Sequence, residues 1–331
     1  MNKALLVSVV VPAYRCKKTI SETIQAILNQ SCPSLELIVV DDGSQDETTM
    51  IIQSFPQVKY IFQDNAGPAS ARNHGAFETK GEFIFFTDSD CIPHRDWIEM
   101  AMRYFGDPQV AVVAGSYDIA NPEFILARCI HKEIMYRHHQ LMPMHPKSFG
   151  SYNFGVRKKV FMDVGGFDTG YRYASGEDND LSYKIIKAGY KIYFAKDTLV
   201  KHFHTTQINK YLYEQSRHGF WRVKMYIDHP SMAWGDDYTF WKDMVEVPLV
   251  YTGIMGLILR PWLFHGLAQI GGGAFTVLYF IELFYSFLMI KDFGESLYYS
   301  FVMFLRAFAR VLGLTMSILN FFFNNSIKKS K

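Results

Sequence analysis

Two groups of carboxylates stand directly after apolar runs of the sequence. Asp41 and Asp42 follow the run Leu35–Val40, and Asp88 and Asp90 follow the run Glu82–Thr87. An Asp-x-Asp spacing lets one or two carboxylates hold a hard divalent cation while phosphate oxygens fill the other coordination positions. If both runs are parallel strands, their acidic ends meet at the edge of the sheet where α/β proteins bind ligands. The pattern therefore predicts a metal-assisted site for a nucleoside diphosphate.

A third acidic pair, Glu177-Asp178, follows Gly176 at the start of a predicted helix over Glu177–Ala188. The N-terminus of a helix favours anions. A carboxylate there is suited to take the proton from an attacking hydroxyl in a direct displacement that inverts the reacting carbon. The pair is therefore a candidate source of a general base. The alternative is ordinary charge complementation of a helix N-terminus.

The elements that must position these acids follow an alternating pattern. From residue 1 to about 205, short β-branched runs alternate with helical stretches, which is typical of a parallel α/β sheet. The predicted strands are Leu6–Val11, Leu35–Val40, Val58–Phe62, Glu82–Thr87, Val110–Ser116, Ser151–Val156, Ile192–Ala195 and Leu199–His202. In the second half, the predicted helices are Phe124–Gln140, Glu177–Ala188 and Gln207–Tyr226.

The composition changes near residue 240. The segment Trp262–Ile290 contains a single acid, and Leu297–Phe323 is apolar apart from Arg306 and Arg310. Both segments are long enough to cross a hydrocarbon layer of about 30 Å. The two arginines share one helix face, which indicates interfacial as well as spanning helices.

We therefore predict a catalytic domain over residues 1–230 and a membrane-associated helical region over residues 231–331. The lysine-rich tail favours a cytoplasmic C-terminus. The expected location is the inner or cytoplasmic membrane, with the catalytic domain facing the cytoplasm. The alternative for the last hundred residues is a buried helical subdomain of a soluble protein.

Several function classes are disfavoured. No G-x-x-x-x-G-K-[ST] is present, and Pro12-Ala13-Tyr14-Arg15 stands where a dinucleotide-binding protein has its glycines. A formal net charge of +2 does not favour a nucleic-acid partner. The four cysteines form no Cys-x-x-Cys pair, so neither a zinc site nor a disulfide framework is predicted.

Six motifs follow one another in an informative order. They are Val9-Val-Val-Pro-Ala-Tyr14, Asp41-Asp-Gly-Ser44, Asn65-Ala-Gly-Pro-Ala-Ser-Ala-Arg-Asn-His-Gly75, Asp88-Ser-Asp90, Gly165-Gly-Phe-Asp168 and Gly176-Glu-Asp-Asn-Asp-Leu181. In this order they resemble a family 2 glycosyltransferase, up to about residue 225. The resemblance implies a GT-A fold, an α/β domain with a Rossmann-like and mostly parallel sheet. It also implies inverting transfer of a sugar from a nucleotide donor.

The resemblance assigns roles to individual residues. The residues implied to bind the nucleotide sugar are Pro12, Tyr14, Asp41, Asp42, Asn65, Gly67, Arg72, Asp88 and, at the donor sugar, Asn153. Those implied to hold the divalent cation are Asp88, Asp90 and His204, and those implied to serve catalysis are Asp178 and Glu177. Arg72 would assist the leaving diphosphate. His202 and His204 lie on one face of an extended chain, and His204 is the one we assign.

The expected partners follow from these roles. The donor would be a nucleotide sugar, with a UDP-sugar as the first choice, and the cation Mn²⁺ or Mg²⁺, since oxygen ligands suit either. The acceptor would be a hydroxyl of a membrane-proximal glycan or lipid-linked molecule, in cell-envelope polysaccharide biosynthesis.

Two alternatives remain open. One is a polyprenyl-phosphate glycosyltransferase, served by the basic residues Lys210, Arg217 and Arg222. The other is an inactive scaffold that binds a nucleotide sugar within a glycan assembly complex.

Overall fold

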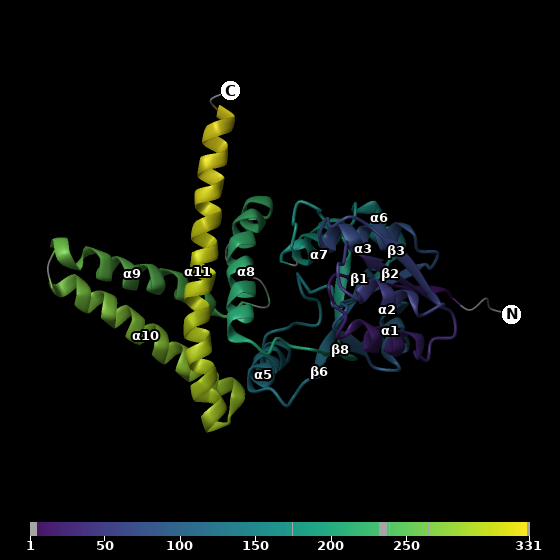
Figure 1. Ribbon diagram of the computed structural model, residues 1–331, viewed down its shortest axis with the longest axis horizontal. Coiled ribbons are helices and arrows are strands. Elements are labelled where there is room, and N and C mark those ends of the chain that lie inside the picture. The colour runs from purple at the N-terminus through teal and green to yellow at the C-terminus, as the bar shows by residue number, and fades with distance from the viewer. Residues whose placement is uncertain (1–4, 174, 232–236, 238, 264, 330–331) are drawn as a thin grey trace. The chain divides into compact units, whose positions relative to one another are not determined.

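The computed structural model describes residues 5–173, 175–231, 237, 239–263 and 265–329 (Figure 1). The chain divides into two compact units. The first contains residues 1–121 and 138–203, and the second contains residues 122–137 and 204–331.

The first unit is built on an eight-stranded sheet with the order β3-β2-β1-β4-β7-β6-β8-β5. The strands are β1 Val7–Ala13, β2 Leu35–Asp41, β3 Val58–Phe62, β4 Phe83–Thr87, β5 Cys91–Pro93, β6 Val110–Ile119, β7 Asn153–Arg157 and β8 Lys191–His202. Strands β1 to β4 are mutually parallel, as are β6 and β8. Strand β7 runs antiparallel to β4 and β6, and β5 runs antiparallel to β8. The sheet is of the expected α/β type but more mixed in direction than expected.

The helices of this unit connect the strands and cover the sheet (Figure 1). They are α1 Ile20–Leu28, α2 Thr48–Gln53, α3 Pro68–Phe77, α4 Trp97–Met102, the 3₁₀ turn Arg103–Gly106, α6 Lys158–Asp163 and α7 Glu177–Lys187. Consecutive residues of β1, such as Val9, Val10 and Val11, are all fully buried. Because successive side chains of a strand point to opposite faces, the sheet is covered on both sides, which explains its continuous apolar runs.

The predicted strands are confirmed in place, with two differences. Ile192–Ala195 and Leu199–His202 belong to one strand, β8, whose pairing with β6 shifts register between Gly115 and Ser116. The three-residue strand β5, directly after the Asp-x-Asp motif, was not predicted. Its antiparallel pairing with β8 places Cys91 opposite His202.

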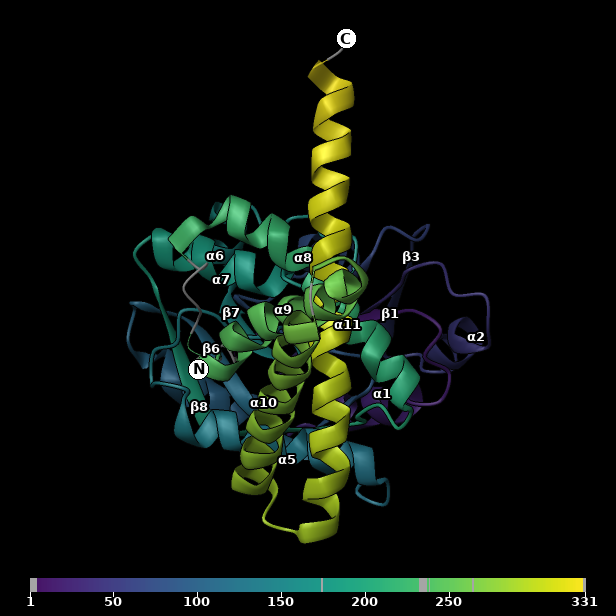
Figure 2. The same cartoon turned by 90° about the vertical axis from the view of Figure 1, so that its left-hand side faces the viewer.

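The second unit is helical (Figures 1 and 2). It contains α5 Ile125–Gln140 as far as residue 137, followed by α8 Ile208–Asp228, α9 Trp241–Leu263, α10 His265–Ile290 and α11 Phe293–Lys329. Among the described residues, the segments Ala268–Ile290 and Phe293–Phe321 have the length and composition of membrane-crossing helices.

Within the second unit, α8 packs closely on α11. A Cβ placed on Gly313 of α11 would lie 1.8 Å from the carbonyl oxygen of Ser216, and one on Gly219 of α8 would lie 2.1 Å from that of Arg310. The two backbones therefore touch where the helices cross. The mixed polar composition of α8 gave no sign of this contact.

This crossing yields a prediction about stability. Gly313→Ala should lower the free energy of unfolding by about 1–3 kcal/mol, because the added methyl group forces the helices apart. Gly273→Ala is the matched control, since a Cβ on this helical glycine of α10 meets no atom within 4 Å. It should leave stability unchanged or raise it by up to about 1 kcal/mol. The stability of both variants is measured by thermal unfolding in detergent, monitored by circular dichroism. Equal unfolding temperatures for the two variants would contradict the contact.

Candidate functional site

The carboxyl ends of the central strands bring the predicted acids to one edge of the sheet. Asp41 is the last residue of β2 and pairs in register with Ala13 of β1. Asp88 follows Thr87, the last residue of β4, which pairs with Asn153 at the start of β7. The predicted grouping of the acids at the strand ends is therefore present in the structure.

Asp42 is buried at this edge and its carboxylate is surrounded by protein donors. Oδ1 accepts hydrogen bonds from Gln63 Nε2 at 2.7 Å and from the Ala66 amide at 2.8 Å. Oδ2 accepts from Asn65 Nδ2 at 3.1 Å and from the Gly67 amide at 2.9 Å. These four bonds hold the loop after β3 against the loop after β2. Asp42 and Asn65, which we expect to contact the nucleotide, thus also fasten the loop.

Asp41 is also committed to internal bonds. Its Oδ1 accepts a hydrogen bond from the Ser44 amide at 2.9 Å. Its Oδ2 accepts from Thr49 Oγ1 at 2.5 Å and from the Tyr60 hydroxyl at 3.3 Å. The side chain is fully buried. As with Asp42, the contacts present are those of a residue that shapes the edge.

Gly67 begins α3 with a backbone that only glycine adopts readily. Its φ is +92°, and a Cβ there would lie 2.5 Å from the carbonyl oxygen of Arg172. The glycine thus lets the segment around Arg172 approach this loop closely.

Tyr14 offers exposed aromatic surface at the same edge. It follows β1, is 46% exposed, and has the Arg15 guanidinium 5.3 Å from its ring centroid. Pro12, two residues earlier, is half-buried. Of the residues expected to hold the base and ribose, Tyr14 is the one whose side chain is open to a ligand.

Arg72 connects two of the predicted acidic groups. Its buried guanidinium, on α3, donates from Nη2 to Asp88 Oδ1 at 2.6 Å and from Nη1 to Glu177 Oε1 at 3.0 Å. The carboxylates of Asp88 and Glu177 keep the pKa of Arg72 above its ordinary value despite its burial. Arg72 was expected to assist the leaving diphosphate. The structure shows it pairing the carboxylates of Asp88 and Glu177.

The pair Glu177-Asp178 opens α7 and its members differ in exposure. Glu177 is buried and accepts a further hydrogen bond from the Ser175 amide at 2.7 Å, whereas Asp178 is half-buried. Burial and the Asp178 carboxylate raise the pKa of Glu177 to about 7. Burial also raises the pKa of Asp178, although Arg72 opposes this effect. Asp178 is therefore the more accessible member of the pair.

Asp90 lies beside a histidine. The Nε2 atom of His202 is 3.5 Å from Asp90 Oδ1, and ligand atoms of Asp90, Cys91 and His202 lie within 4.8 Å of one another. Burial raises the pKa of the Cys91 thiol well above its ordinary value, which disfavours the thiolate that binds metals. A carboxylate and an imidazole, both partly exposed, fit a divalent cation such as Mn²⁺. Asp88, expected as a further ligand, is engaged by Arg72.

Two other predicted site residues have different surroundings. His204 belongs to the second unit, where its ring centroid lies 5.7 Å from that of His131. Asn153 is buried, accepts from Trp97 Nε1 at 2.7 Å, and donates to the carbonyl oxygens of Ser116 and Thr198. Its polar atoms thus join α4, β6 and β8. The resemblance signalled a histidine here. That His202 lies beside Asp90 depends on strand β5, which was not predicted.

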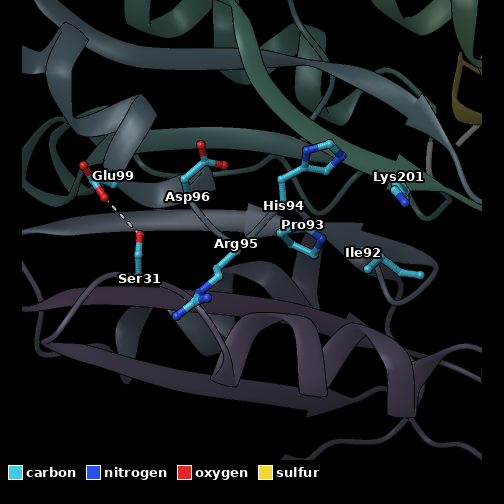
Figure 3. A pocket seen from close by; sticks show the side chains of 8 residues that line it. All are labelled: Ser31, Ile92, Pro93, His94, Arg95, Asp96, Glu99 and Lys201. Atoms are coloured by element: carbon cyan, nitrogen blue, oxygen red, sulfur yellow. Dashed lines mark hydrogen bonds between the residues drawn. The ribbon is translucent and has the colours of Figure 1, made fainter.

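A hollow of about 600 Å³ lies next to the β5–β8 pair. The side chains around it are those of Ser31, Ile92, Pro93, His94, Arg95, Asp96, Glu99 and Lys201 (Figure 3). A Ser31–Glu99 hydrogen bond closes one part of it. None of the predicted site residues lines this hollow. We therefore locate the candidate site by its chemistry, at the strand ends.

Comparison with known proteins gives the family. Residues 8–175, slightly more than half of the chain, match the family model for glycosyl transferase family 2. The chain therefore belongs to glycosyl transferase family 2.

Two curated relatives resemble the chain over about three fifths of its length. The pre-mycofactocin glycosyltransferase of Mycobacterium tuberculosis (strain CDC 1551 / Oshkosh) is 32% identical over 211 residues, which cover 61% of this chain and 44% of that protein. Glycosyltransferase AglE of Haloferax volcanii is 29% identical over 203 residues, 59% of this chain and 66% of that protein. The match thus spans less than half of the mycobacterial relative.

One solved structure resembles nearly the whole chain. The mannosyltransferase PcManGT from Pyrobaculum calidifontis, in complex with GDP-Man and Mn²⁺, superposes with a TM-score of 0.59 at 18% identity. The likeness covers 94% of this chain and 88% of that one. At 18% identity, this likeness supports a shared fold only. With the family match, it confirms the expected GT-A fold.

The histidine pair provides a matched test of the metal site. His202→Ala should weaken Mn²⁺ binding at least about tenfold, because it removes the imidazole beside Asp90. His204→Ala should leave Mn²⁺ affinity unchanged. The two Mn²⁺ affinities are measured by titrating each purified full-length variant with Mn²⁺. The electron paramagnetic resonance signal reports the concentration of free ion. Loss of affinity in His204→Ala alone would assign the ligand to His204 after all.

Proposed function

We propose that the chain transfers a sugar from a nucleoside-diphosphate donor to an acceptor hydroxyl, with inversion at the sugar carbon. The observation that carries this proposal is the placement of Asp178. This half-buried carboxylate adjoins Glu177, which Arg72 joins to Asp88 at the start of the Asp-x-Asp motif. A base and a diphosphate-binding motif are thereby held together at one edge of the sheet.

The donor would be held between Tyr14 and Asp90. Tyr14 offers an exposed ring on which a nucleoside base can stack. Asp90 and His202 would hold a divalent cation, and that cation, when bound, neutralises charge on the diphosphate leaving group. A UDP-sugar remains the first choice of donor, and the GDP-Man bound by PcManGT makes a GDP-sugar the second donor to test.

Asp178 would act as the general base. It takes the proton of the acceptor hydroxyl as that oxygen forms its bond to the sugar carbon, while the bond to the nucleoside diphosphate breaks on the opposite face. Glu177 is buried against Arg72 and does not reach an acceptor. Its role would be to position the neighbouring carboxylate and adjust its pKa.

The acceptor would be membrane-proximal, because two helices of the second unit have the length and composition of membrane spans. The chain would then work at the cytoplasmic face of the inner or cytoplasmic membrane. A glycan or lipid-linked hydroxyl fits this position. A polyprenyl phosphate is the second candidate acceptor, since Lys210 of α8 is exposed and offers a charge for a lipid phosphate.

Donor binding and transfer can be separated experimentally. In a thermal-shift screen of detergent-solubilised protein with Mn²⁺, we expect one class of nucleotide sugar to stabilise the chain, by about 2.7 kcal/mol at a hundredfold excess over Kd. Chelation of the metal should abolish the shift. Asp178→Asn should keep this shift but lose sugar transfer, because an amide cannot accept the proton.

Each contrary outcome has a definite meaning. Folded protein that shifts with no nucleotide sugar would favour the inactive-scaffold alternative or a donor site that needs the acceptor. Near-normal turnover in Asp178→Asn would show that another residue is the base.

The raised pKa values of the acidic pair predict a pH dependence. Activity should fall as the pH drops through about 7, because the pair then gains a proton and the base is lost. Glu177→Gln removes the neighbouring negative charge, so the acidic limb of kcat/KM should move to lower pH. Asp163→Asn, an exposed carboxylate paired with Lys159, should leave the profile unchanged. An acidic limb that stays in place in Glu177→Gln would contradict the coupling.

A further inference from the structure

The apolar helix α11 carries two arginines that any crossing of a membrane would have to include. Its candidate span is Phe293–Phe321. A crossing takes about 20 residues. Every 20-residue stretch within this span contains residues 302–312, and therefore both Arg306 and Arg310. The surroundings of these arginines decide how α11 can lie.

Both arginines are bound to other helices of the second unit. Arg306 is buried, and its Nη1 donates to Glu133 Oε2 of α5 at 2.7 Å and to the Tyr211 hydroxyl of α8 at 3.2 Å. Arg310 Nε donates to Gln215 Oε1 of α8 at 2.9 Å. Its Nη1 also lies 3.4 Å from Asp243 Oδ1 and 3.5 Å from Glu246 Oε2, both of α9. This face of α11 is thus covered by α5, α8 and the polar first turns of α9.

The covering helices carry polar side chains that are partly exposed. On α5, Arg128 and Lys132 are partly exposed and bind Glu295 of α11 at 2.7 Å and 2.6 Å. The charged residues of α8 are Lys210, Glu214, Arg217, Arg222, Lys224 and Asp228. Charged groups in the hydrocarbon are costly, and those that do occur there are paired or face an aqueous cavity. The arginine face of α11 therefore lies on the water side.

The opposite face of α11 is apolar and uncovered. The exposed large side chains there include Leu297 at 40%, Phe301 at 53%, Leu312 at 58%, Met316 at 53% and Leu319 at 50%. At about 100° of rotation per residue, they fall within a stripe about 100° wide, which we call the apolar stripe. Arg306 and Arg310 lie on the other side of the helix axis.

We propose that α11 lies along the surface of a lipid bilayer, with its apolar stripe in the interface, and does not cross the membrane. A helix with one apolar face and one charged face is the kind that binds in the interfacial plane. A crossing would draw α5 and α8 into the hydrocarbon with it. Helix α10 remains as the element that enters the bilayer, since its segment Ala268–Ile290 has the length and composition of a span. Its Glu282 is buried and is paired with Lys242 of α9 at 3.0 Å. This proposal does not depend on the chemistry of the first unit.

Spin-label depth measurements test the orientation. Single cysteines replace Phe301, Met316 or Leu319 in a full-length chain whose four natural cysteines are replaced. The labelled protein is reconstituted into phosphatidylethanolamine–phosphatidylglycerol vesicles. For a helix in the plane, the three depths should agree within about 5 Å, at the boundary of headgroups and acyl chains. For a crossing helix, positions 301 and 319 would differ in depth by up to about 27 Å, at about 1.5 Å per residue.

A label on α8 is the matched control. Tyr213 is 65% exposed on this helix, and a label in its place should report water. A depth gradient along α11, or a Tyr213 label inside the bilayer, would overturn the proposal. Three stripe labels that all report water would also overturn it, in favour of a protein partner.

The sidedness of the two ends gives a second measurement. Phe293, at the start of α11, is 71% exposed, and Ser330 lies near the end of the chain. Single cysteines at these positions should react with a membrane-impermeant maleimide from the same side of sealed vesicles. Reaction from opposite sides would show that α11 crosses.

Discussion

The candidate site depends on one buried guanidinium group, that of Arg72. The Arg72 guanidinium pairs with Asp88 after β4 and with Glu177 at the start of α7, although Glu177 is 105 residues further along the chain. A buried charge is tolerated only when it is paired, and removing one partner leaves the others uncompensated. Without Arg72, the carboxylates of Asp88, Glu177 and Asp178 would repel one another at the same edge. The arginine therefore assembles the acids that the chemistry requires.

A second constraint acts on the loops around this ion pair. Asp42 accepts four hydrogen bonds from the loop that leads into α3, the helix that carries Arg72. Fixing that loop fixes where α3 begins, and so where the guanidinium lies. The acids that look most like ligands in the sequence thus divide into two groups. Asp41 and Asp42 are buried and bonded at the edge, whereas Asp90 and Asp178 are partly exposed.

The sequence was sufficient to predict the strands and the grouping of acids at their ends, because buried parallel strands are continuous apolar runs. It was not sufficient to predict which of His202 and His204 lies beside Asp90. That choice depends on the pairing of Cys91 with His202 across β5 and β8, and a three-residue strand leaves no periodic signal. Nor did a charge count reveal that Arg72 is buried, since both of its partners are distant in the chain.

The same limitation applies more strongly to α11. A hydropathy average sums the residues around the whole circumference of a helix, so it does not register that the arginines and the exposed apolar side chains lie on opposite faces. The local spacing of Arg306 and Arg310 does predict one polar face. Local spacing does not predict which residues bind that face. Glu133 and Gln215 are 173 and 95 residues away from the arginines they bind, and they come from polar helices. The polarity of those partners, rather than the hydropathy of α11 itself, decides which environments the helix can occupy.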